Sequence, residues 1–501
     1  MVVRNTVFLR LCVLLPVIAA AVLLPLSTVN GQETSRVAAA GELTDRADTA
    51  DDAKANAAKD GATVSPFAVV VDPERITAFD YTMSISGQLL TPTESGLQKW
   101  KLESSGDFGF LQRQRNTELS GPLSLDAVRR FSDAEVVMNV GDEHRTVTQL
   151  PASLQTIRCT GADTGIVYTS ASSTRGRNMP LTRKHLDLLQ MPGDPLVCSG
   201  LMPTGDVKEG EKWNTGSWVM PLLTGLEAVI EQSVTCEMES LKDDTASVTF
   251  EGSASGAVVG SASKINVSGK LTFDRRTGLI TSYAATHVEE RSAGPISPGL
   301  QVTVDVNWTQ RVAESPADEP SADETPADTE LAADFGDSEP TPAELSLQIQ
   351  TPWKLQFQHS REWHVFNQTS TLLLLRQIRN GNLIAQCNLS PGVSVAPGQA
   401  ADDRQFATDV SQALSSRDGQ IVDQSTVRDD AAWRIRQVRA IGKASDQTIN
   451  YDYYLCSAKT GEQFSFVFSY SDADAEAFGD EGSRILETLA LLRRRPALPF
   501  R

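Results

Sequence analysis

The side chains in this sequence best suited to proton transfer or metal binding are five histidines: His144, His185, His287, His359 and His364. They include no H-E-x-x-H motif. No two of them are four residues apart, the spacing that places two imidazoles on one face of a helix. His359 and His364 flank Ser360–Trp363, which we expect to lie in a strand and a surface loop. The sequence therefore predicts no metal site.

Motifs for nucleophilic catalysis and for nucleotide binding are also missing from the sequence. The segment nearest to a G-x-S-x-G nucleophile elbow is 252–256 (GSASG), but its serines are in the wrong register and it lies in an expected strand. We expect its small residues to allow close packing or a bend. No G-x-x-x-x-G-K-[ST] or G-x-G-x-x-G motif is present. The sequence predicts no catalytic residue and no cofactor, although a pair of carboxylates of the glycosidase type has no sequence signature and stays open.

Five cysteines follow the N-terminal segment, and none forms a C-x-x-C pair: Cys159, Cys198, Cys236, Cys387 and Cys456. Cys387 and Cys456 are the only two in the C-terminal half, which makes them the candidate disulfide pair of an exported chain. The alternative is that both are small buried hydrophobic residues.

The elements that would position these side chains begin after an export signal. Arg4 and Arg10 precede a 16-residue apolar run, Leu11–Leu26, and small and polar residues end at Gly31. This order is typical of a secretory signal peptide, so residues 1–31 are expected to be removed from a secreted or periplasmic protein. The alternative is an uncleaved anchor that leaves the bulk of the chain outside the cytoplasm, with no other membrane contact.

Composition divides the rest of the 501-residue chain into two folded blocks. Residues 32–65 lack aromatic side chains and are expected to be disordered. Residues 313–345 contain eleven acidic residues, five prolines and no Lys or Arg, a composition typical of an extended, disordered linker. The predicted domains are therefore 66–312 and 346–497. The net charge of −19 argues against nucleic acid and anionic lipid as partners.

The first block is expected to be antiparallel β, with short helices at 181–189 and 222–229. Its strands alternate apolar and polar residues: 79–89, 97–103, 134–140, 247–251, 264–268, 270–273 and 301–306. Turns are expected at Gly269 and at 275–278. The runs Gly210–Trp213 and Gly269–Asp274, with Gly278 after them, resemble lipoprotein-carrier-like half-barrels. This resemblance implies a concave apolar face for a lipid chain or a partner.

The second block is expected to be an antiparallel sheet with packed helices. Its predicted helices are 403–416 and 473–494, and its predicted strands are 353–359, 371–378, 383–389, 421–427, 433–441, 449–456 and 463–470. The residues 453–455, 461–468, 472–474 and 485–489 resemble the PsbP/Mog1-like α/β/α sandwich family. This resemblance implies a largely non-enzymatic accessory, assembly or ligand-binding module.

Taken together, the sequence predicts an α+β protein with two β-rich modules joined by an acidic linker. The function that these features favour is that of an exported, non-catalytic binding or accessory protein, which takes an unidentified protein partner or an apolar ligand. The alternative is an extracytoplasmic hydrolase with an unrecognised carboxylate site.

Overall fold

The computed structural model describes residues 67–93, 96–115, 121–142, 144–162, 165–171, 173–174, 177–294, 297–313, 340–444 and 447–492. The predicted signal peptide (1–31), the predicted disordered segment (32–65) and most of the predicted linker lie outside these residues. Within them, no helix has both the length and the apolar character needed to cross a membrane.

The chain is β-rich and its sheets are antiparallel, as predicted. Twelve strands form the larger sheet, in the order β6-β5-β3-β2-β1-β14-β13-β12-β11-β10-β9 with β4 paired to β3. The strands of this sheet, and the short pair β7–β8 beside it, have these bounds: β1 Ile76–Thr93, β2 Gly96–Gln114, β3 Asp126–Val140, β4 His144–Gln149, β5 Thr156–Ala162, β6 Gly165–Ser170, β7 Ser173–Thr174, β8 Arg177–Asn178, β9 Lys212–Asn214, β10 Ala228–Lys242, β11 Thr245–Val258, β12 Ser261–Asp274, β13 Leu279–Arg291 and β14 Gly299–Val312.

Alternating side chains explain why these segments form strands with one buried face. In β12, Ile265 and Val267 are buried whereas Lys264 and Asn266 are exposed. The turn predicted at 275–278 is confirmed, because β12 ends at Asp274 and β13 begins at Leu279. The turn predicted at Gly269 is wrong. The strand continues through Gly269 because the ring of Phe250, opposite it on β11, packs into the space that a side chain would need.

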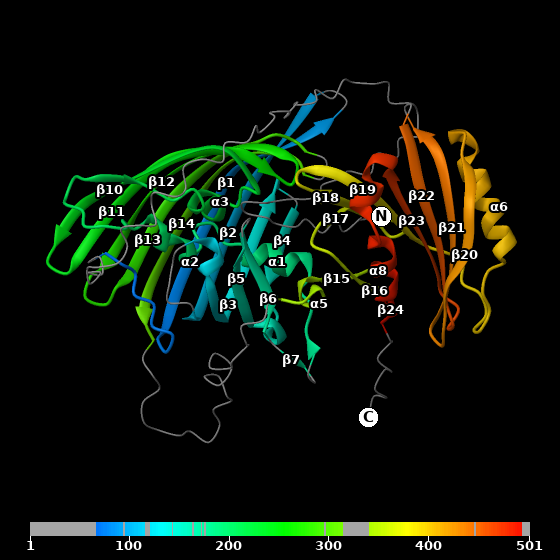
Figure 1. The fold of residues 1–501 in the computed structure, drawn as a ribbon, viewed down its shortest axis with the longest axis horizontal. Coiled ribbons are helices and arrows are strands. Elements are labelled where there is room, and N and C mark those ends of the chain that lie inside the picture. Colours follow the sequence, from blue (N-terminus) through cyan, green and yellow to red (C-terminus); the bar gives the residue numbers. More distant parts are fainter. Residues whose placement is uncertain are drawn as a thin grey trace, which may run out of the picture.

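Three short helices pack against the inner face of the larger sheet, over which the strands arch in Figure 1. They are α1 (Arg183–Leu189), α2 (Pro195–Cys198) and α3 (Val219–Thr224); α1 and α3 overlap the two predicted helices. Tyr81 donates a hydrogen bond to the carbonyl of Pro192 at 2.6 Å, and Trp308 donates one to Gly193 at 3.0 Å. The inner face is therefore filled by this helical segment, where the resemblance implied an open concave groove.

The second part of the chain contains a seven-stranded and a three-stranded sheet. The seven-stranded order is β17-β18-β19-β23-β22-β21-β20, and the small sheet is β15-β16-β24. The bounds are: α5 Pro342–Leu345, β15 Leu347–Gln350, β16 Leu355–His359, β17 Trp363–Gln368, β18 Leu373–Arg379, β19 Asn382–Pro391, α6 Asp403–Leu414, β20 Gln420–Asp429, β21 Trp433–Ala444, β22 Gln447–Ala458, β23 Gln463–Ser471, α7 Ala475–Phe478, α8 Glu481–Glu487 and β24 Ala490–Leu491.

One face of the seven-stranded sheet packs on α7, α8 and the small sheet around buried aromatic side chains, among them Trp363, Phe357 and Phe466. At one end of this sheet α6 covers the other face, with Val410 and Leu414 buried. The predicted helix 403–416 is thus confirmed, with Asp402 as its N-cap. The single helix predicted at 473–494 is wrong: Gly479, with a φ of 55°, separates α7 from α8, and the chain then forms β24 against β16.

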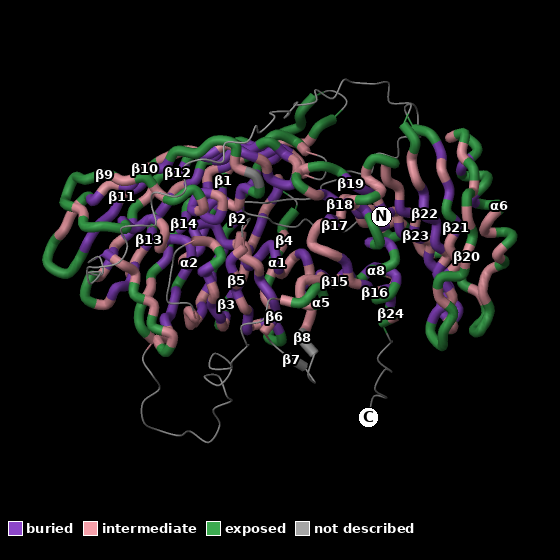
Figure 2. Tube along the Cα trace, in the orientation of Figure 1, coloured by how far each residue is buried: buried purple, intermediate pink, exposed green. Residues whose placement is uncertain are grey.

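The two parts of the chain pack directly against each other. Leu347 forms a parallel bridge with Leu181, and the backbone N–H group of the next residue, Gln348, donates to the Leu181 carbonyl at 2.8 Å. Leu347 is fully buried and belongs to the core of the first part, as does Ile378 of β18. Figure 2 shows buried residues continuing from the larger sheet into this junction. The junction positions the site described next.

Candidate functional site

A cavity of about 550 Å³ lies at the junction, and both parts of the chain line it. The first part contributes the β5–β6 hairpin, α1, α3 and the turn after β11. The second part contributes the segment that leads into β17 and the β18–β19 hairpin. Its volume falls in the usual range of about 300–1,000 Å³ for small-molecule sites.

Much of the cavity wall is apolar. Ile166 from β6 and Leu186 from α1 face it together with Leu222 from α3 and Ile378 from β18. Leu186, Leu222 and Ile378 are buried, whereas Ile166 is half-buried at the cavity surface. These side chains come from segments far apart in the sequence, so only the docked fold creates the apolar wall.

Two arginines lie in the cavity wall where the parts meet. Arg361 donates from Nε to the Leu345 carbonyl at 2.9 Å and from Nη2 to the Tyr168 carbonyl at 2.6 Å. Arg183 donates to the carbonyls of Trp363, at 3.2 Å, and of Arg361. Burial lowers the pKa of Arg361 to about 10, because its positive charge is taken out of water.

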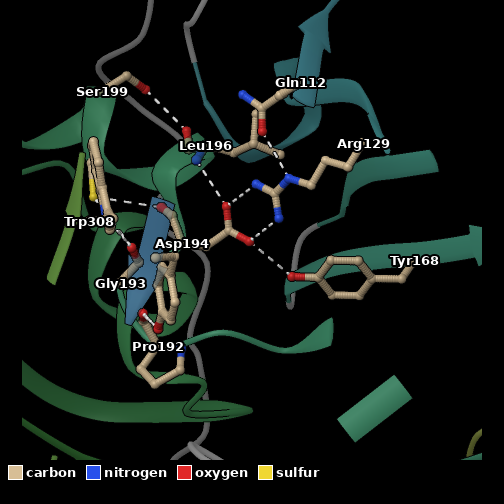
Figure 3. Close-up of polar contacts among 11 residues, drawn as sticks. Gln112, Arg129, Tyr168, Pro192, Gly193, Asp194, Leu196, Ser199 and Trp308 are labelled. Carbon is tan, nitrogen blue, oxygen red and sulfur yellow. Dashed lines mark hydrogen bonds and ion pairs between the residues drawn. The ribbon is translucent and has the colours of Figure 1, made fainter. Parts of the chain in front are cut away.

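A buried ion pair holds the floor of the cavity (Figure 3). Arg129 donates from Nη1 and Nη2 to the two carboxylate oxygens of Asp194, at 2.7 and 2.5 Å, and from Nε to Gln112 at 2.8 Å. Asp194 also accepts from the hydroxyl of Tyr168 at 3.1 Å and from the Leu196 N–H group at 2.9 Å. This network ties β3 and β6 to the helical segment.

Burial and the charge of Asp194 shift the pKa values of groups in and beside this network away from those of a reactive acid, base or nucleophile. Burial acts to lower the pKa of Arg129, but the attraction of Asp194 outweighs it and leaves that pKa above its usual value. Burial raises the pKa of the Tyr168 hydroxyl and that of the Cys198 thiol, with the negative charge of Asp194 adding to both. The Asp194 carboxylate accepts from four donors, and these hydrogen bonds fix the position of the chain at this point.

The second carboxylate on the cavity wall is also held in an ion pair. Arg379 donates from Nε and Nη2 to the two oxygens of Glu362, at 2.7 and 2.8 Å, and Gln377 donates to it at 2.9 Å. Burial acts to raise the pKa of Glu362, but these hydrogen bonds outweigh it and lower that pKa overall. A glycosidase needs a carboxylic acid with a raised pKa, whereas the pKa of Glu362 is lowered.

Among the histidines, the structure brings His364 to the cavity wall and buries His359 beside Arg183. The strand and the turn predicted here are present, since β16 ends at His359 and a turn follows at 361–362. The predicted surface position is wrong, because His359, Trp363 and His364 are buried and Trp363 begins β17, a strand that the sequence did not suggest. Within the described ranges, no group of three or more His, Cys, Asp and Glu side chains is placed to hold a metal ion.

The suggested disulfide between Cys387 and Cys456 does not form in the structure. Both thiols are free and buried. Cys387 lies on β19 and Cys456 on β22, with β23 between them. Strands two apart are about 10 Å from each other, whereas a disulfide joins Cα atoms about 4.4–6.8 Å apart. Burial raises the pKa of both thiols, as expected of small buried hydrophobic residues.

Sequence reasoning missed the residues that shape the cavity: Arg129, Tyr168, Arg183, Asp194 and Arg361. No motif marks them, because their contacts join residues up to 193 positions apart. The one local signal is the Asp194-Pro195 pair, in which an N-cap residue precedes a proline at the first position of a helix.

Comparisons with known proteins add no functional information. No family model and no curated protein sequence matches this chain. A protein of known structure from Bacteroides thetaiotaomicron is 9% identical, with 30% of this chain covered and a TM-score of 0.22; the match spans half of that protein's length. The translocator domain of the autotransporter NalP from Neisseria meningitidis is 6% identical, with coverages of 80% and 89% and a TM-score of 0.09. A BenF-like porin from Pseudomonas fluorescens is 8% identical, with coverages of 79% and 98% and a TM-score of 0.12. These TM-scores are too low to carry an argument about fold or function.

Proposed function

We propose that this chain is an exported, non-catalytic binding protein whose two β-rich modules hold an apolar ligand between them. The observation that carries the proposal is the cavity of about 550 Å³ at the junction, with apolar side chains from both modules on its wall. The resemblances to lipoprotein-carrier-like half-barrels and to PsbP/Mog1-like sandwiches agree with it, since both imply carrier or accessory modules.

The arrangement of polar groups supports binding over hydrolysis. Asp194 and Glu362 are committed to arginine partners, and burial raises the pKa of the nearby Cys198 thiol, which makes it a poor nucleophile. The filled inner face of the larger sheet argues against a ligand there, so the proposal places the ligand in the junction cavity.

Binding of a neutral apolar dye, N-phenyl-1-naphthylamine, tests the proposal on the full chain. We expect saturable fluorescence enhancement that Ile166→Trp reduces at least about tenfold, because the larger side chain fills the cavity. Ile230→Trp is the matched control, since Ile230 is 78% exposed on β10, and it should bind the dye like the unaltered chain.

Two results would contradict the proposal. One is the absence of saturable binding, or equal binding by the Ile166→Trp and Ile230→Trp variants. The other is turnover of glycosidic or ester substrates that is lost in Glu227→Gln, a third carboxylate on the cavity wall. That result would favour the hydrolase.

A further inference from the structure

One cation on the cavity wall, Arg361, has no carboxylate partner among the described residues. Arg129 lies behind the wall and neutralises Asp194, and Arg379 neutralises Glu362. The Arg361 side chain donates hydrogen bonds to two backbone carbonyls, those of Leu345 and Tyr168. A guanidinium has five N–H donors. Arg361 therefore brings a partly desolvated positive charge, with donors to spare, to the edge of the cavity.

A second arginine, Arg183, lies on the same side of the cavity wall. Arg183 is 7% exposed, and its guanidinium contacts the backbone on both sides of Glu362, at Arg361 and Trp363. Burial lowers the pKa of the nearby His359 to about 3, and the positive charge of Arg183 adds to this effect. The one further carboxylate on the wall, Glu227, accepts from the Val259 N–H group at 2.8 Å, on the first module.

An anion on this side would give the half-buried Arg361 guanidinium the counter-charge that the described residues do not supply. Carboxylate and phosphate oxygens match the planar arginine donors, and such charge-assisted hydrogen bonds are about twice as strong as neutral ones. The apolar part of the wall includes Ile166, Leu186 and Leu222, which suit an apolar chain. A ligand that complements both the cationic and the apolar part of the cavity wall has an anionic head and an apolar tail.

We propose that the junction cavity binds an amphipathic anion, with its carboxylate or phosphate head on Arg361 and its apolar tail against Ile166, Leu186 and Leu222. This inference rests on the proposed function and names its ligand class. A free fatty acid and a lipid phosphate share this chemistry, so both head groups enter the test.

The test is displacement of the neutral dye from the full chain by probes of one chain length: laurate, dodecyl phosphate, dodecanol and dodecylammonium. We expect laurate or dodecyl phosphate to displace the dye at about tenfold lower concentration than dodecanol, with dodecylammonium weakest. The anion that binds more tightly identifies the source, carboxylate or phosphate. Inorganic phosphate alone should not displace the dye.

Variants of Arg361 test whether this residue causes the preference for anionic probes. Arg361→Gln should remove most of the preference for laurate over dodecanol, and Arg361→Lys should keep part of it. Arg484→Gln, at an arginine whose side chain is 65% exposed on α8, is the matched control and should leave the preference unchanged. Arg361 also joins the modules through Tyr168, so small-angle scattering of each variant shows whether docking is kept. The comparison of probes on the unaltered chain stands even where a variant fails to fold.

Outcomes separate the inference from the function on which it rests. If the dye binds but dodecanol competes as well as laurate, the ligand class is wrong while the proposed binding function stands. If inorganic phosphate displaces the dye as well as laurate does, the site is one for small oxyanions and the tail has no role. If the dye does not bind, the proposed function fails first.

Discussion

At the scale of single residues, the most consequential contact is the ion pair between Arg129 and Asp194. Both side chains are fully buried, at 0% and 1% exposure, so each charge depends on the other for compensation. The pair fixes the segment that carries the carbonyls of Pro192 and Gly193, which accept from Tyr81 and Trp308. The ion pair therefore holds the helical filling of the sheet and the cavity floor in place.

Removing the cation should destabilise the fold strongly. We expect Arg129→Met to lower the free energy of unfolding by about 3–5 kcal/mol, because it leaves the Asp194 carboxylate buried without a counter-charge. Adding Asp194→Asn should recover a large part of this loss. Urea unfolding followed by tryptophan fluorescence measures both. Arg311→Met is the control: its partner Asp80 is exposed, so the loss should stay below about 1 kcal/mol. Equal losses at Arg129 and Arg311 would contradict the role given to the buried pair.

Buried histidines make the stability depend on pH. Burial lowers the pKa of His287 to about 4, from 6.5 in the unfolded chain, and the nearby charge of Asp305 opposes this only in part. The unfolded state therefore binds the proton more tightly. The contribution of His287 to stability is complete above pH 6.5 and is lost as the pH falls toward 4.

Replacing His287 should flatten this dependence. We expect the unaltered chain to lose about 2 kcal/mol through this residue between about pH 7 and about pH 5, and His287→Leu to avoid that loss. The Nε2 atom of His287 has no hydrogen-bond partner among the described residues, so the substitution leaves no partner unsatisfied there. Urea unfolding at the two pH values measures the difference. If the free energy of unfolding of His287→Leu depends on pH in the same way as that of the exposed control His144→Leu, His287 is not the source of the pH dependence.

At the scale of elements, close backbone approach between strands decides where small residues are needed. The GSASG segment at 252–256, which has serines but no nucleophile elbow, lies within β11. A Cβ atom at Gly252 would lie 2.1 Å from the carbonyl oxygen of Ser233 on β10. The small residues therefore serve close packing of β10 on β11, as the sequence suggested.

This packing predicts a difference between neighbouring positions. Gly252→Ala should lower the free energy of unfolding by about 1–3 kcal/mol, because β10 must move to admit the methyl group. Ser253→Ala, at the next residue, should change it by less than about 0.5 kcal/mol. Thermal unfolding of the two variants checks this. Equal stability of the two variants would contradict this prediction, because it would show that β10 can move without a loss of stability.

At the scale of the whole molecule, the two parts are docked by side chains that cross the junction. Leu347 follows the long segment between the modules and inserts into the core of the first, where it is 0% exposed. Together with the bridge to Leu181 and the contact of Arg361 with Tyr168, it holds the cavity walls together.

Truncating Leu347 should loosen the junction. We expect Leu347→Ala to cost about 2–5 kcal/mol of stability and to increase the radius of gyration in small-angle scattering, because a buried side chain is lost from the contact. Leu383→Ala is the control at a leucine that is 44% exposed on β19, and neither quantity should change. An unchanged radius together with an unchanged unfolding midpoint in Leu347→Ala would contradict the docking.

The sequence alone determined much of the local structure. Strands such as β1 and β12 and the helix α6 follow from alternation, from helical spacing and from the Asp402 cap, because these signals act between residues close in the chain. The same local signals led to wrong predictions at positions where contacts between residues far apart in the sequence determine the backbone conformation. β12 continues through Gly269, where the ring of Phe250 occupies the space of a side chain. The end of the last predicted helix forms β24 instead, because it pairs with β16.

Only the tertiary structure decided the cavity. Its apolar wall joins side chains from β6, α1, α3 and β18, and its cations come from Arg183 and Arg361, residues that sequence patterns would assign to a helix surface and a loop. Burial matters most for Arg361, because a guanidinium in water needs no counter-charge whereas a partly desolvated one does. Burial depends on how the two modules meet, and that depends on contacts between residues far apart in the chain.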